Sequence, residues 1–177
     1  MILGLSIATF TFLHVLVSLI AIGSGFIVVL GLISGRRLPR WTALFLITTA
    51  ATSLSGFLFP IKGITPGIVL GILSLVVLLL AVVGLYGARL AGAWRGTYVV
   101  TSTLALYFNF FVLIVQAFRK VPALKALAPT QSEAPFKITQ LVVLLAFIVL
   151  STLALKRFRE EPRGMHESWQ RNSSSSD

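Results

Sequence analysis

The stretch "GIVLGILSLVVLLLAVVGLYGA", residues 67–88, contains no charged side chain and decides the fold class. An α-helix crosses a hydrocarbon core about 30 Å thick with about 20 apolar residues. Backbone groups that meet lipid must bond within their own segment, and this solidly apolar run lacks the alternation of a barrel strand. We therefore predict that residues 67–88 form a transmembrane helix.

Four further runs of the same character flank this one. They lie within 3–34 and at 41–59, 97–118 and 138–155. We predict an all-α polytopic membrane protein, a single bundle of five transmembrane helices formed by residues 1–158. Residues 159–177 turn polar and end in "RNSSSSD". Because that composition cannot bury a core, we expect a disordered C-terminal tail.

The composition supports this class and limits the partners. Only 11% of the residues are charged, against about 25% in a soluble domain. The 15 Lys and Arg residues exceed the 5 Asp and Glu residues, which gives a net charge of +10. The basic residues sit between and after the apolar runs, so we expect membrane lipid and not nucleic acid as the partner. With no Cys, the chain forms no disulfide and no Cys-ligated metal site.

The distribution of Lys and Arg predicts the orientation. The segment before the first run has no basic residue, whereas the loop "GRRLPR", residues 35–40, has three arginines. With that loop in the cytoplasm, roughly twice as many basic residues lie inside as outside. We therefore predict the N-terminus outside and the C-terminus in the cytoplasm.

Polar side chains recur on one face of three predicted helices, because residues three, four or seven apart share a face. The spacing holds for Thr11, His14 and Ser18 in the first run, Thr48, Thr52 and Ser55 in the second, and Ser102, Asn109 and Gln116 in the fourth. A buried amide needs a hydrogen-bonding partner, so we predict that these faces pack on each other. The candidate site is this polar seam, formed by His14, Ser18, Thr52, Ser55, Asn109 and Gln116.

His14 is the only ionisable residue of the first run, and two interpretations of it stay open. In the first, the imidazole is neutral, bonds to Asn109 or to a hydroxyl, and fixes the helix register. In the second, the seam lines an outward-facing pocket or water path in which His14 carries protons or binds a ligand.

The loop "APTQSEAPF", residues 128–136, holds Glu133, the only acidic residue before the tail. Its prolines predict an extended loop and not a helix. We expect the Glu133 carboxylate to pair with Lys62 or Lys137. In the alternative, the loop covers the outer mouth of the seam and brings Glu133 beside His14, which would form a pair able to bind a proton or a cation.

Small residues four apart suggest close helix packing. Gly84, Ala88, Gly92 and Gly96 follow this spacing, as do Gly31 with Gly35 and Gly67 with Gly71. Such a row on one helix face lets two backbones approach closely. We expect packing within the chain, with a homo-oligomer or an interface in a larger membrane complex as the alternative.

Motifs for catalysis and cofactor binding are missing from the sequence. No predicted helix contains Asp or Glu, which argues against carboxylate acid–base chemistry. A haem with two His ligands needs a second intramembrane histidine, but His166 lies in the tail. No G-x-S-x-G nucleophile pattern occurs. We therefore predict no cofactor, no metal site and no enzyme activity.

The segments "WTALFLITTAATSLSGFLFP" and "LYFNFFVLIVQAFRKVPALKALAPTQSEAPF" resemble a group of small bacterial inner-membrane proteins of unknown function. The resemblance covers most of residues 1–158 and implies a multi-pass inner-membrane protein, without implying any functional residue. The residues favour a non-enzymatic accessory subunit or small binding module. The alternatives are a solute or proton conduit through His14, Asn109 and Gln116, and a quinone- or haem-associated redox subunit that uses His14.

Overall fold

The computed structural model describes residues 1–60, 63 and 65–158. The described residues form α1 (Ile7–Ile33), α2 (Pro39–Gly56), α3 (Pro66–Val82), the π-helix η1 (Val83–Gly87) that continues α3, α4 (Ala93–Lys120), α5 (Pro122–Leu127) and α6 (Ala134–Arg157). The predicted all-α class is confirmed. The expected disorder of the tail, together with Lys62 and His166, falls outside the described residues.

Four helices in the described part of the chain are long and apolar enough to cross a membrane: α1, α3 with η1, α4 and α6. The described residues thus contain the long apolar helices that a helical membrane protein requires. The helix α2 does not belong to this set, because its 18 residues begin with Pro39 and Arg40 and include several Thr and Ser. The predicted count of five spans thus stays a prediction for α2.

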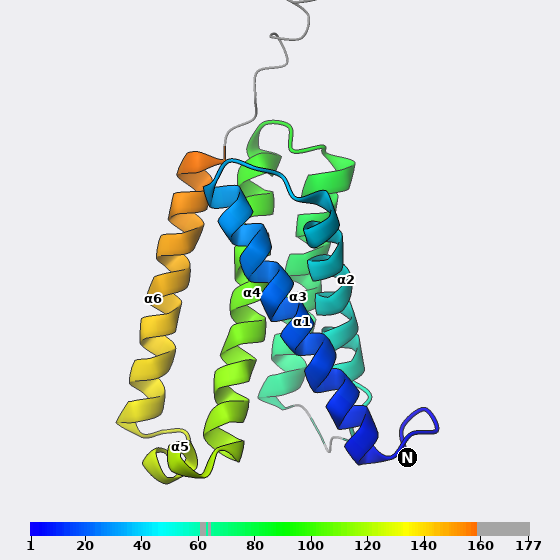
Figure 1. The fold of residues 1–177 in the computed structure, drawn as a ribbon, viewed down its shortest axis with the longest axis vertical. Helices are drawn as coiled ribbons and strands as arrows, with labels where there is room; N and C mark the ends of the chain where they lie inside the picture. Colours follow the sequence, from blue (N-terminus) through cyan, green and yellow to red (C-terminus); the bar gives the residue numbers. More distant parts are fainter. Residues whose placement is uncertain (61–62, 64, 159–177) are drawn as a thin grey trace, which may run out of the picture.

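The long helices form an antiparallel bundle (Figure 1). The helix α1 packs against α2, α4 and α6, while α2 contacts α3 and α3 contacts α4. The helices α1 to α4 therefore close a ring of contacts, and α6 lies outside this ring against α1 and α4. In Figure 1, α1 crosses the bundle at a tilt, which fits a 27-residue helix longer than a membrane requires.

One end of the bundle carries most of the positive charge. There α1, η1 and α6 end and α2 and α4 begin (Figure 1). The Arg95 guanidinium donates a hydrogen bond to the Phe158 carbonyl and so ties the start of α4 to the end of α6. We call this the basic end, and its charged residues are Arg36, Arg37, Arg40, Arg89, Arg95, Lys156 and Arg157.

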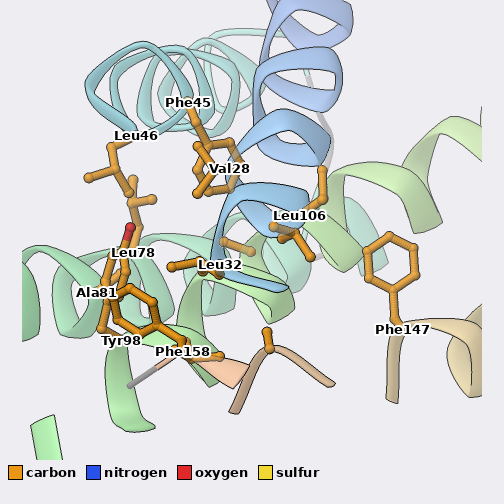
Figure 2. Packing of buried hydrophobic residues seen from close by; sticks show 14 of the residues in the cluster. Val28, Leu32, Phe45, Leu46, Leu78, Ala81, Tyr98, Leu106, Phe147 and Phe158 are labelled. Atoms are coloured by element: carbon orange, nitrogen blue, oxygen red, sulfur yellow. The ribbon is translucent and has the colours of Figure 1, made fainter. Parts of the chain in front are cut away.

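The core lies where α1 passes closest to α2 and α4. Phe45 of α2 and Leu106 of α4 are fully buried there, beside α1 in Figure 2. Gly25 allows this approach, because a Cβ at that position would lie 2.6 Å from Leu106 Cδ1 and 2.8 Å from Phe45 Cε2. Any larger residue at position 25 must push these side chains away.

A glycine turn joins α1 to α2. Gly35 has a φ of +69°, and the Arg36 backbone N–H bonds the Gly31 carbonyl at 2.9 Å. These features define a Schellman cap, in which glycine accepts the left-handed conformation without steric cost. Leu38 then packs on Gly31, where a Cβ would lie 2.8 Å from Leu38 Cδ1. The turn is thus held at both of its ends.

A widened turn ends α3. The Ala88 N–H bonds the Val83 carbonyl at 2.8 Å, and the Leu90 N–H bonds the Gly84 carbonyl at 2.9 Å. Arg89 and Leu90 have φ values of 49° and 61°, which costs side-chain-bearing residues about 1–3 kcal/mol each. The Leu90 side chain is fully buried, and this burial helps to hold the strained turn in place.

This turn overturns one prediction about small residues. Gly84, Ala88, Gly92 and Gly96 cannot share a helix face, because η1 ends at Gly87 and α4 begins at Ala93. Glycines of the other two rows contact their own chain instead. A Cβ at Gly71 would lie 2.9 Å from the Phe57 ring, and Gly31 has the Leu38 contact described above.

Candidate functional site

His14 joins α1 to α2 through a side-chain hydrogen bond. Its Nδ1 lies 2.8 Å from Ser55 Oγ, and its half-buried ring forms a T-shaped pair with Phe59 with the centroids 5.2 Å apart. Ser55 Oγ also donates to the Thr52 carbonyl at 3.1 Å. Because a hydroxyl has one hydrogen, His14 Nδ1 donates to Ser55 Oγ in the tautomer in which Ser55 bonds Thr52, and it accepts the Ser55 hydrogen in the other tautomer.

Asn109 makes a second contact, from α4 to α2. Its Nδ2 donates to Thr49 Oγ1 at 3.2 Å and to the Ala105 carbonyl of its own helix at 3.3 Å. The Thr49 side chain is fully buried. Asn109 therefore pairs with a hydroxyl of α2, and not with His14.

Thr49, Thr52 and Ser55 form a row along α2. A step of three residues falls short of one turn, so Thr49 and Ser55 lie about 9 Å apart along the axis and about 120° apart around it. This rotation explains why Thr49 meets α4 while Ser55 meets α1. Thr52 lies between them, and its Oγ1 is buried with no hydrogen-bond partner in the described structure.

The predicted seam is therefore split into separate pairs. His14 with Ser55, and Asn109 through Thr49, bring α1, α2 and α4 together as expected. Two predicted members stand apart from these pairs. Ser18 donates to the Val15 carbonyl within α1, and Gln116 is exposed near the end of α4.

Two further interhelical contacts were missed by the sequence analysis. Ser53 of α2 donates to Ser74 of α3 at 3.2 Å, and the buried Gln140 of α6 donates to the Phe111 carbonyl of α4 at 3.3 Å. The sequence contained a signal that could have indicated both contacts. Ser74 is the only hydroxyl residue within α3, and Gln140 is the only amide residue within α6.

Glu133 is held by its own loop at the end opposite the basic end. Its carboxylate accepts hydrogen bonds from Thr130 Oγ1 at 2.8 Å and from the backbone N–H groups of Thr130 and Ser132. Desolvation raises the pKa of Glu133, but the hydrogen bonds from Thr130, Ser132 and its own backbone outweigh that effect and hold the pKa below its ordinary value.

These local bonds bear on the predictions for the loop. Within the described residues, the side-chain bonds of Glu133 go to its own loop and that of His14 goes to Ser55, so the structure does not join these two residues. The prediction that the prolines keep residues 128–136 out of a helix is also wrong for the end of this loop, where α6 begins. Pro135 lies in the first turn of α6, a position that tolerates proline.

The described residues contain no group of three or more His, Cys, Asp or Glu side chains able to hold a metal ion. The chemistry available to the membrane part is therefore that of hydroxyls, amides and one imidazole. No family model, curated protein or solved structure matched this chain.

Proposed function

We propose that the chain is a non-enzymatic membrane protein of the bacterial inner membrane, an accessory subunit or small binding module with a rigid helical core. The observation that carries this proposal is the pairing of polar side chains between helices. His14 with Ser55, Asn109 with Thr49, and Ser53 with Ser74 each join two helices. Groups used in this way fix helix register and are not left free along a continuous path.

The proposal includes five spans with the basic end in the cytoplasm. In Figure 1, α1 ends at the basic end and α3 begins at the opposite end, and α2 runs between them. A chain in which α1 and α3 both cross in the same direction needs α2 to return through the membrane. The arginine-rich α1–α2 turn supports the cytoplasmic location, because cytoplasmic loops are enriched in Lys and Arg.

Copurification tests the accessory role. The tagged full chain is expressed in bacterial membranes, solubilised gently, and analysed for proteins that accompany it in fixed ratio. We expect a defined membrane partner and no turnover or flux from the chain alone. A chain that purifies without partners and moves a solute or protons in liposomes would contradict the proposal.

A proton or solute conduit is the second candidate function. It is favoured by Thr52, whose buried hydroxyl lacks a partner in the described structure, and by His14, whose imidazole can carry a proton. The substitution His14→Asn separates the two functions, because an amide can still donate to Ser55 but cannot carry a proton. In liposomes, a conduit loses proton flux in His14→Asn, whereas a scaffold shows no flux with either residue.

A further inference from the structure

A cavity of about 250 Å³ lies at the basic end of the bundle, far along α1 from His14. Its charged wall is the α1–α2 turn, which contributes Arg36 and Arg37. Thr42 of α2, Tyr98 of α4 and Tyr86 of η1 add three hydroxyl groups. Apolar side chains of α1, including Val28, complete the lining.

The cavity offers hydrogen-bond donors of the kind that bind phosphate. Two guanidinium groups supply charged donors in a planar arrangement that matches phosphate oxygens. Thr42 and Tyr98 are only 5% and 3% exposed, so their hydroxyls belong to the floor, whereas Tyr86 is 58% exposed at the rim. A charged upper wall above a partly apolar floor suits a ligand that is itself amphipathic.

The arginines of this cavity face no carboxylate in the described part of the chain. Glu133 is the only acidic residue among residues 1–60, 63 and 65–158, and it lies at the opposite end of the bundle. An anion outside the described residues can therefore supply this charge.

The backbone around the cavity is held in place before any ligand arrives. The Schellman cap at Gly35 and the contact of Leu38 with Gly31 fix the turn that carries the two arginines. On the other side, η1 and the left-handed pair Arg89–Leu90 fix the position of Tyr86. Strained backbone and π-helical turns concentrate at functional sites.

We propose that this cavity binds the phosphate group of an anionic phospholipid headgroup. The cavity lies where apolar helices end, at the level of the headgroups, and basic pockets between membrane helices bind such groups. It is smaller than the about 300–1,000 Å³ of pockets that enclose whole small molecules. A headgroup fills it while the acyl chains stay in the bilayer. This inference does not depend on the proposed function.

Lipid retention by the purified full chain tests the proposal. The chain is stripped of lipid in detergent and incubated with phosphatidylglycerol, with phosphatidylcholine or with inorganic phosphate, and bound molecules are counted by native mass spectrometry. We expect one retained phosphatidylglycerol molecule per chain and weaker retention of phosphatidylcholine. The double variant Arg36→Gln/Arg37→Gln should bind phosphatidylglycerol about tenfold more weakly or worse.

The matched control is Arg40→Gln/Lys156→Gln, which removes the same charge from exposed positions outside the cavity lining. Its affinity should stay within about twofold of the parent chain, because neither of these side chains lines the cavity. Tyr86→Phe should weaken binding several-fold without disturbing the fold. Equal losses in both double variants, equal retention of phosphatidylcholine, or binding of inorganic phosphate as tight as that of phosphatidylglycerol would each overturn the proposal.

Discussion

At the scale of single residues, His14 is held by one hydrogen bond and one aromatic contact. Its Nδ1 lies 2.8 Å from Ser55 Oγ, and either tautomer of a neutral imidazole can make this bond. A neutral imidazole is much cheaper to hold in a membrane than a charged side chain. The Ser55 hydroxyl therefore gives a neutral histidine a hydrogen-bonding partner inside the helical bundle.

We expect His14→Ala to lower the free energy of unfolding by about 1–2 kcal/mol, because it removes the bond to Ser55 and the edge contact with Phe59. His14→Asn should recover part of this loss. Unfolding of the detergent-solubilised chain by dodecyl sulfate measures the effect. The control is Ser18→Ala, since Ser18 bonds only within α1, and a loss as large as that of His14→Ala would contradict the assignment.

Glu133 predicts a pH dependence for its loop. Its pKa in the folded chain is lowered by hydrogen bonding, so the unfolded loop binds more protons at acidic pH. The stabilisation is complete above the unfolded value of about 4.3 and is lost as pH falls through the lower folded value. The protection factors of the Thr130 and Ser132 amides, measured against the intrinsic exchange rate at each pH, should fall over that range. Glu133→Gln should remove this acid-dependent change, and persistence of it in the variant would exclude the carboxylate as the cause.

At the scale of helices, α2 connects the bundle with short side chains. It bonds α1 through Ser55, α4 through Thr49 and α3 through Ser53. Thr49 and Ser53 are four residues apart and share one face of α2, whereas Ser55 lies about 120° around the helix from Thr49. The small volume of all three lets each neighbour come near. The Thr and Ser residues that make α2 less apolar than the other long helices thus form its contacts with those helices.

Gly25 offers a test of the close helix crossing. Gly25→Ala should lower the free energy of unfolding by about 1–3 kcal/mol, because its Cβ would lie 2.6 Å from Leu106 Cδ1. Gly23→Ala is the matched control two residues away, where nothing lies within 4 Å of the added atom. It should leave stability unchanged or raise it by about 0.5–1 kcal/mol, because Ala favours a helix. Similar effects of the two substitutions would contradict the crossing.

The sequence predicted the positions of the helices better than it predicted which side chains of different helices contact each other. Runs of apolar residues located the long helices, because length and composition alone decide a span. Spacing also placed Ser55 and His14 on faces that meet. It failed for Gln116, which shares the seven-residue spacing of Asn109 but is exposed, because spacing describes one helix and not what surrounds it. The row from Gly84 to Gly96 failed because η1 and a turn interrupt it.

At the scale of the whole molecule, charge and chain direction agree. The basic end gathers the arginines of the α1–α2 and η1–α4 connections and the last turn of α6. The opposite end has fewer basic residues and carries Glu133. This asymmetry is the basis of the proposed orientation.

Cysteine labelling tests that topology directly, because the chain has no cysteine of its own. In intact cells, an impermeant thiol reagent should label Leu58→Cys and Leu127→Cys, both exposed at the end opposite the basic end. Ser34→Cys should react only after the membrane is opened. If Ser34→Cys and Leu58→Cys react from the same side, α2 does not cross. If all three positions react in the reverse pattern, the orientation is inverted.

The position of α6 outside the ring has a consequence for biogenesis. The helices α1 to α4 contact one another in a closed cycle without it. Membrane chains emerge from the ribosome in order, so this cycle can assemble while α6 is still being synthesised. The helix α6 then docks on a surface that already exists, without rearranging the helices that precede it.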